Sequence, residues 1–312
     1  MASTSTSAAR KPRRSTTSVS ATRTTAATEE VTQAEPPARG AKRSMVPVPM
    51  RFPFDLSTWP ETEYVAPIAF LRSALFGIVP KGRRRSVEGL SLAHYGGFEL
   101  RFTGEVLDQF DHDLWLVAVR LAREHGMGMN VHFSKRSILK ALGWDTSGKS
   151  MTRLHGSFVR LVKATIEIQG KGSHYAGHLV DEVVFTKGPS GAADGDDQYY
   201  FRLSPKMATL FAPEQSALLN VQERQKIKAP LAKWLQGFII ASPFAFPILI
   251  AKLRQLSGSS ESERYRFRSR ITAALEELRD VGVIESFRLD RTSVYITQKS
   301  GTALPRNSRA AV

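Results

Sequence analysis

Residues 134–150 read SKRSILKALGWDTSGKS, and the structure of this stretch decides the fold of the chain. Positions 143–150 match the phosphate-binding pattern GxxxxGK[ST], which in a nucleotide-binding protein directly follows a buried β-strand. Here the pattern follows apolar residues at helical spacing, with Ser134 as a candidate N-cap. The stretch therefore predicts a helix that ends at Gly143, a turn and a second helix. Nucleotide binding through a phosphate loop remains an alternative.

The second helix of this pair is predicted over residues 148–163. Its apolar residues share one face, as expected for a helix that covers a core. The opposite face carries the polar and basic residues Lys149, Thr152, Arg153, Arg160 and Lys163. Because the second helix of a helix-turn-helix enters the major groove, we interpret these residues as candidates for DNA binding.

Other elements flank this pair in a recurring order. The first half predicts a strand at 98–104, a helix at about 105–124 and a short strand VHF, and later strands ATIEI, HLVDEVVF and YYFRL. The second half predicts a helix from Pro230, a strand FAFPI, a helix ending at Gly258, a long helix and the hairpin VIESFRL–TSVYIT. A helix-turn-helix followed by a β-hairpin is a winged helix. The expected fold is thus α+β, with two tandem winged-helix domains after a disordered basic tail.

The long helix of the second half begins with ERYRFRSR, residues 263–270. The helix dipole disfavours cations at this end, whereas the acidic Glu276, Glu277 and Asp280 lie at the opposite end, also against the dipole. This order fits a basic end placed in a DNA groove, and a solvated charged face is the alternative. The further DNA-binding candidates are Arg264, Arg266, Arg268, Ser269, Arg270, the basic cluster Arg83, Arg84 and Arg85, and Arg291 in the hairpin turn.

The composition favours a polyanionic partner. The net charge is +15 and the sequence pI is about 10.2, which favours nucleic acid or an acidic membrane surface. The absence of cysteine excludes disulfides, zinc fingers and thiol nucleophiles, and the seven histidines form no ligand set, so no cofactor or metal is expected. The uncharged stretch 234–251 is interrupted by Pro243 and Pro247, so we expect no membrane span and a cytoplasmic protein.

Composition shifts predict five segments. These are a disordered Ser/Thr/Ala/Arg-rich tail (1–46), an arm with a basic linker (47–97), a first winged-helix domain (98–204), a second (205–300) and a disordered C-terminal tail (301–312).

Several short motifs together resemble the TrfA-type plasmid replication initiators. They are DLSTWPET at 55–62, RSALF at 72–76, FTGEVLD at 102–108, LGW at 142–144, LVKATIEI, and the spaced LRQLSGS and ALEELRDVGVIE of the second half. The resemblance covers about Pro53 to Gln298 and leaves out the N-terminal tail. It implies tandem winged-helix proteins that bind repeated sites, called iterons, in double-stranded plasmid origin DNA.

The same resemblance implies a set of partners. Family members help to open AT-rich DNA, recruit the host replication initiator and the replicative helicase, act in plasmid copy control and exchange between monomer and homodimer. They are not enzymes. The family also has a sliding-clamp-binding motif of the QLSLF type, where this chain has MRFPF. Phe52 and Phe54 are therefore candidates for a degenerate clamp-binding segment. A sequence-specific transcriptional regulator uses the same fold and remains the alternative function.

Overall fold

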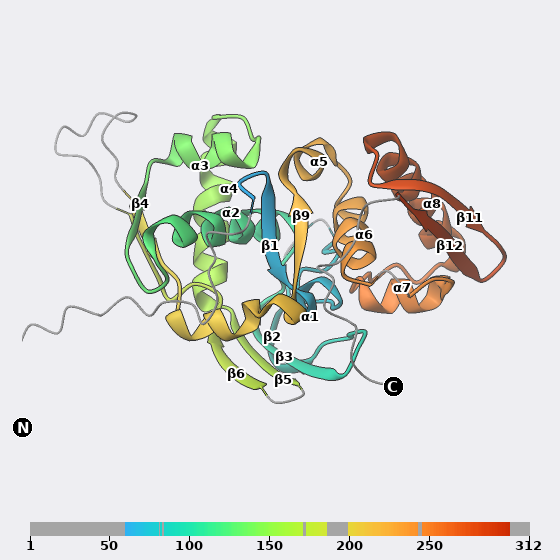
Figure 1. Ribbon diagram of the computed structural model, residues 1–312, viewed down its shortest axis with the longest axis horizontal. Coiled ribbons are helices and arrows are strands. Elements are labelled where there is room, and N and C mark those ends of the chain that lie inside the picture. Colours follow the sequence, from blue (N-terminus) through green and yellow to red (C-terminus); the bar gives the residue numbers. More distant parts are fainter. Residues whose placement is uncertain are drawn as a thin grey trace, which may run out of the picture. The chain divides into compact units, whose positions relative to one another are not determined.

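The computed structural model describes residues 60–80, 82, 84–170, 173–185, 199–242 and 245–299. The two predicted tails, the candidate clamp-binding residues Phe52 and Phe54, and Arg83 of the basic cluster lie outside these ranges. Within them, the fold mixes helices and sheets, which confirms the α+β class (Figure 1).

No helix in the described ranges is both long and apolar enough to cross a membrane.

The helices and strands follow one another in an order that contains a repeat. The first half contains β1 (Glu63–Pro67), α1 (Ile68–Leu71), β2 (Ser86–Ser91), β3 (Phe98–Glu105), α2 (Gln109–His125), β4 (Val131–Phe133), α3 (Lys135–Leu142), α4 (Gly148–Lys163), β5 (Thr165–Gly170), β6 (Ser173–His178), β7 (Glu182–Phe185) and β8 (Tyr199–Arg202). The second half contains the 3-10 turns η2 (Pro205–Phe211) and η3 (Pro213–Gln215), and then β9 (Ser216–Asn220), α5 (Val221–Lys226), α6 (Pro230–Ala241), β10 (Ile248–Leu249), α7 (Ile250–Leu256), α8 (Arg264–Val281), β11 (Ile284–Leu289) and β12 (Ser293–Gln298).

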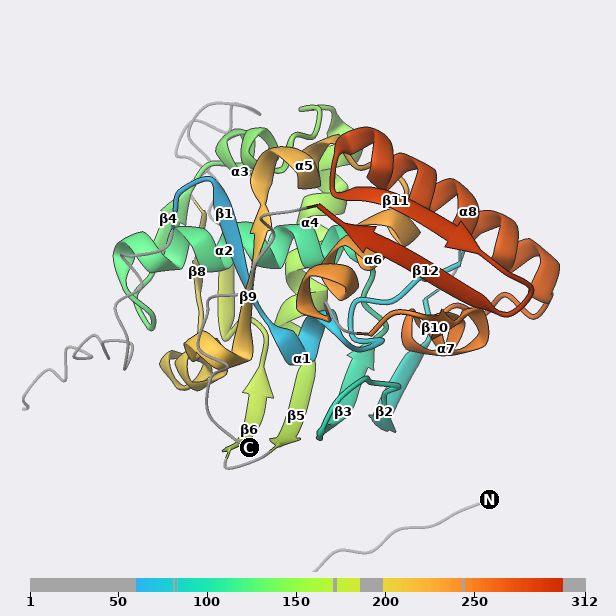
Figure 2. The same cartoon turned by 45° about the vertical axis from the view of Figure 1, so that its right-hand side comes forward.

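Two modules share one topology. The first module, residues 109–202, and the second module, residues 230–298, each contain a helix, a short strand, two further helices and a hairpin. Each short strand pairs with the last strand of its module, which gives the sheet orders β4-β8-β7 and β10-β12-β11, with antiparallel neighbours. In both views of the molecule, α8 runs beside the β11–β12 hairpin (Figures 1 and 2).

The first module differs from the second by an inserted hairpin. After α4 the chain forms β5 and β6, which join β2 and β3 in a separate four-stranded antiparallel sheet. The prediction of one strand in HLVDEVVF was wrong, because His178 ends β6 and β7 begins only at Glu182. The reason lies in the consecutive residues Leu179 and Val180. Both are fully buried, whereas neighbouring side chains of a strand point to opposite faces.

Two other predicted boundaries differ from the structure. The helix expected from residue 105 begins at Gln109, because the Asp108 carboxylate accepts hydrogen bonds from the amides of Phe110 and Asp111 and caps the helix there. In FAFPI, the described strand is only Ile248–Leu249, since Pro247 has no amide hydrogen to donate to a sheet.

Two clusters of buried apolar side chains form the interior. The first contains Trp115, Phe158 and Phe201, and nearly all of its buried residues precede α5, with Val221 at the start of α5 and Ala241 at the end of α6 as the exceptions. The second contains Trp234, Phe238, Phe267 and Leu275, and all of its buried residues except Ile78 follow α5. Helix α5 therefore lies along the chain between the main parts of the two clusters.

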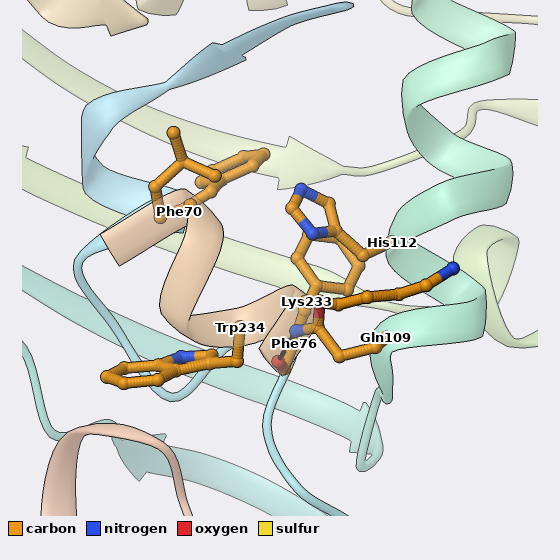
Figure 3. Close-up of a pocket in the computed structure, with 8 residues that line it drawn as sticks. Phe70, Phe76, Gln109, His112, Lys233 and Trp234 are labelled. Atoms are coloured by element: carbon orange, nitrogen blue, oxygen red, sulfur yellow. Dashed lines mark hydrogen bonds between the residues drawn. The ribbon is translucent and has the colours of Figure 1, made fainter. Parts of the chain in front are cut away.

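A polar cluster is buried where α2, α5 and α6 meet. Its centre is Arg224 of α5, whose side chain bonds to groups of α2 and α6, and the adjoining small pocket is lined by Gln109 and His112 of α2 and by Lys233 and Trp234 of α6 (Figure 3). The His112 ring stacks on Phe76 at 4.4 Å between ring centroids. Its Nε2 atom has no hydrogen-bond partner in the described part of the chain.

The burial of His112 predicts a loss of stability in weak acid. Burial, and then the charges of Arg224 and Lys233, lower the pKa of His112 well below its ordinary value of 6.5. The acidic group of the same cluster is Asp113, which pairs with Arg224. Below pH 6.5 the unfolded chain binds a proton that the folded chain excludes. The free energy of unfolding should therefore fall by up to about 1.4 kcal/mol per pH unit from this residue.

Urea unfolding of the wild type and of His112→Asn between pH 7.5 and 5 tests this expectation. Asparagine keeps an acceptor for Arg224 and cannot titrate. The stability difference between the two proteins should change below pH 6.5 and stay constant above it. A difference that is independent of pH would contradict the assignment.

Candidate nucleic-acid interface

The segment that matches the phosphate-binding pattern forms the turn between α3 and α4. Gly143 ends α3 in the left-handed conformation, with φ at 68°, and Ser147 caps α4 by accepting a hydrogen bond from the amide of Ser150. Asp145 accepts hydrogen bonds of 2.9 Å from the Ser147 amide and the Ser150 hydroxyl. The Ser147 hydroxyl, and then these two bonds, lower the pKa of Asp145 to about 2. A helix, rather than a buried strand, leads into Gly143. The local structure is thus a helix-turn-helix, as the sequence predicted.

The exposed side of α4 carries part of the predicted basic face. The side chains of Lys149, Arg153 and Lys163 are exposed. Thr152 is also exposed, and its hydroxyl donates a 2.9 Å hydrogen bond to the carbonyl of Gly148. These four residues remain predicted DNA contacts, and they lie on the second helix of the pair.

Arg153 is held in place by two aromatic rings. Its guanidinium carbon lies 3.2 Å from the ring centroid of Phe110 and 5.4 Å from that of Trp144. The rings meet edge to face, 5.5 Å apart. Desolvation lowers the pKa of Arg153, although much of its side chain remains accessible to solvent. The stacking stabilises one position of a flexible cation at the surface.

Two of the predicted DNA-binding arginines are bound within the protein. Arg160 makes a bidentate contact with Asp111, in which Nη2 and Nε of the arginine lie 2.7 Å and 3.2 Å from Oδ1 of the carboxylate. The side chain of Asp111 is fully buried. Arg84 pairs with Asp108 and with Asp111, and also donates to the carbonyl of Val106. Burial alone would lower the pKa of Arg160, but the hydrogen bond and charge of Asp111 raise it. Both arginines therefore have a structural role that the sequence did not indicate.

The first turns of α8 present the second basic group. Arg264, Arg266, Ser269 and Arg270 are exposed. Arg266 makes a 3.0 Å ion pair with Glu263, in which the two side chains are 65% and 56% exposed, so the pair is weak and easily exchanged for another partner. These exposed cations lie at the positive end of the helix dipole, where an added anion is stabilised.

Arg268 connects α8 to the turn of the hairpin. It is partly buried and donates a hydrogen bond to the carbonyl of Asp290. The Asp290 carboxylate accepts bonds from the amides of Thr292 and Ser293, and these lower its pKa. Arg291, in the same turn, is exposed. The hairpin turn is thus fixed against the helix and leaves Arg291 facing solvent.

The remaining candidates lie elsewhere. Arg85, which precedes β2, is exposed, and Arg83 lies outside the described residues. Among the described residues, no group of three or more His, Cys, Asp and Glu side chains is placed to hold a metal ion. His174 instead contacts Glu167 at 3.2 Å, and His178 lies 3.4 Å from the Thr165 hydroxyl.

Comparison with known proteins finds relatives for most of the chain. The model of the family described as TrfA protein matches residues 41–297. The plasmid replication initiator protein TrfA of Escherichia coli is 24% identical over 238 residues, which cover 74% of this chain and 61% of that protein. The match therefore spans less than two thirds of that relative's length.

A structural comparison finds two crystal structures of RctB. Domains 2 and 3 of RctB superpose with a TM-score of 0.51 at 13% identity, and the match covers 75% of this chain and 98% of that chain. A second structure of RctB domains 2–3 has a TM-score of 0.49 at 12% identity, with 72% and 96% coverage. The first of these likenesses shows a shared fold and nothing more.

Proposed function

The chain belongs to the TrfA family, and from this premise we propose that it is a plasmid replication initiator that binds repeated sites in double-stranded origin DNA. In this proposal both modules are winged helices, with α4 and α8 as the recognition helices and the β7–β8 and β11–β12 hairpins as wings. The proposed host partners are the replication initiator, the replicative helicase and, through the degenerate segment at Phe52 and Phe54, the sliding clamp. We also propose an exchange between monomer and homodimer.

One observation carries the DNA-binding proposal. The first turns of α8 place exposed arginines at the helix end where the dipole disfavours cations. Such an arrangement costs stability in the free protein, and a nearby phosphate or base edge removes that cost. The proposed surface comprises Lys149, Thr152, Arg153, Lys163, Arg264, Arg266, Ser269, Arg270 and Arg291, with Arg85 beside β2.

A maintenance assay tests the proposed function. A plasmid that keeps the origin but lacks the gene for this chain should persist in its host only when the chain is supplied from a second replicon. The variant Arg264→Ala/Arg266→Ala/Arg270→Ala should fold normally and fail to maintain it. Maintenance without the chain, or full maintenance by the variant, would contradict the proposal.

Within α8, Arg266 and Arg268 are expected to have different roles. Arg266 is exposed and weakly paired, so it is free to reach a guanine, a contact that contributes about 1–3 kcal/mol of discrimination. Arg266→Ala should therefore lower the preference for origin sites over random DNA by about 5- to 150-fold. Arg270→Ala should act in the same direction but less strongly.

Arg268→Ala should lower the affinity for origin DNA and the affinity for random DNA together, because it loosens the hairpin turn without removing a base contact. Paired titrations on origin and scrambled duplexes at one salt concentration measure the ratio of these two affinities for each variant. If Arg266→Ala preserved the ratio while Arg268→Ala abolished it, the assigned orientation of α8 on DNA would be wrong.

A further inference from the structure

One buried carboxylate joins the two modules. Asp113 belongs to α2 of the first module, and its side chain is 6% exposed. It accepts a 2.8 Å hydrogen bond from Nε of Arg224 in the connecting helix α5, and another from Nζ of Lys233 in α6 of the second module. A single acidic group thus pairs with a cation from the connector and a cation from the second module.

Arg224 adds further directional contacts to both modules. Its Nη1 atom donates to the carbonyl of Lys233 at 2.6 Å and lies 3.4 Å from the side-chain oxygen of Gln236, both in α6. Its Nη2 atom donates to the Gln109 side chain at 2.7 Å and lies 3.3 Å from Nδ1 of His112, both in α2. The guanidinium group is planar and rigid, so these contacts fix the angle between α2 and α6.

Close apolar packing surrounds this cluster. A Cβ atom on Gly237 would lie 2.8 Å from Cδ2 of Leu71, so α6 approaches α1 without space for a side chain. The indole of Trp234 donates a 3.1 Å hydrogen bond to the carbonyl of Ser73. Apolar contacts alone tolerate sliding, because the hydrophobic effect is not directional, whereas the bonds of Arg224 and Asp113 are directional.

We propose that the cluster of Asp113, Arg224 and Lys233 fixes the orientation of α8 relative to α4. If α4 and α8 each contact one half of a repeated site, the protein accepts DNA only when these two half-sites lie at one spacing. The second statement rests on the proposed DNA-binding function, and the first does not. The cluster is in this sense a positioning element, since its residues are buried and would not touch DNA.

A matched cluster in the same helix provides the control. Asp111, two positions before Asp113, is also buried and also pairs with two cations, Arg84 and Arg160. All three of these residues precede the connector α5 and pack within the first half of the chain. Replacing this cluster also removes a buried carboxylate and its two cationic partners, but it leaves the contacts between the modules in place.

Distance measurements between the modules test the orientation. The chain contains no cysteine, so spin labels at Lys140→Cys in α3 and Ala273→Cys in α8, both exposed, report one distance. The variant Asp113→Leu/Arg224→Met/Lys233→Met replaces the cluster with apolar side chains of similar size. Such a replacement is often neutral or stabilising, so the variant should fold.

The expected result is a narrow distance distribution in the wild type and a broad one in this variant. The control variant Arg84→Met/Asp111→Leu/Arg160→Met should keep the narrow distribution. A broad distribution in the wild type would overturn the proposal, and so would a distribution in the Asp113 variant as narrow as that of the wild type. If the triple variant does not fold, Arg224→Met alone, which removes the directional bonds to both α2 and α6 and leaves Lys233 on Asp113, must still broaden the distribution.

Binding to altered DNA tests the spacing. One base pair inserted between the half-sites moves them apart by about 3.4 Å and rotates them by about a tenth of a turn. The wild type should lose at least about tenfold in affinity, the loss typical of one wrong contact, and the Asp113 variant should lose clearly less. Equal losses would overturn the spacing claim. A wild type that binds no DNA would overturn the proposed function and the spacing claim together, and a narrow distance distribution would still show a fixed junction.

Discussion

Affinity for origin DNA is expected to fall by about 10³–10⁵ when the salt concentration rises from about 50 to 200 mM. The physical reason is the release of counterions from DNA when cations of the protein neutralise phosphates. The net charge of +15 and the two groups of exposed cations on α4 and α8 supply such contacts. If the modules together neutralise on the order of 6–10 phosphates, the log–log slope should lie near −5 to −9.

Fluorescence anisotropy titrations at several salt concentrations give this slope. Lys149→Ala should make it shallower by about 1, because an exposed lysine at the start of α4 is expected to contact one phosphate. His174→Ala, on the separate four-stranded sheet, is the matched control and should leave the slope unchanged. A slope near zero in the wild type would exclude an electrostatic interface with DNA.

Arg160→Met is expected to reduce the free energy of unfolding by about 3–5 kcal/mol, because it removes one partner of a buried carboxylate. Asp111 is fully buried, and Arg160 provides its bidentate contact, so the remaining Arg84 compensates the charge only in part. Lys163 is exposed on the same helix, so Lys163→Met should change the free energy of unfolding by no more than about 0.5 kcal/mol.

Chemical denaturation of the two variants measures this difference. The sequence had suggested DNA binding for both residues, but the structure gives only Arg160 an internal partner. An Arg160→Met protein as stable as the wild type, with weakened DNA binding, would show that the contact with Asp111 contributes little and that the original interpretation of Arg160 was correct.

Local signals were sufficient to predict most of the helix-turn-helix. Ser134, Gly143 and Pro230 each have one strong local preference, and the structure confirms a helix boundary at each of them. The hairpin of the second module was also predictable from alternation and from the turn at Asp290. The strand pair β1–β9 was not, because its residues are far apart in the sequence.

Side-chain partners were the least predictable feature. The sequence predicted Arg84 and Arg160 as surface cations. Their partner Asp111 lies 27 and 49 positions away along the chain, so no local pattern shows the contact. The same limit hid the cluster around Asp113, since Arg224 is 111 positions from it. A sequence pattern shows that a cation is on a polar face, but only the packing of helices shows whether a carboxylate is buried beneath it.

The second strand of the inserted hairpin, β6, was missed for a different reason, whereas β5 was predicted from ATIEI. This strand, SHYAGH, contains glycine and histidine and has few of the residues that favour strands. It is stabilised mainly by pairing with β5, in a register from Thr165 opposite His178 to Gly170 opposite Ser173. Such pairing depends on a neighbouring strand rather than on local preference.

Footprinting on the plasmid that encodes this chain is the most direct test of its proposed role as an initiator. The expected result is protection of an array of direct repeats beside an AT-rich segment, with each repeat covered on faces of the duplex that two recognition helices can reach together. Protection of a single palindrome at a promoter would contradict it and favour a transcriptional regulator, and uniform protection without repeats would contradict both.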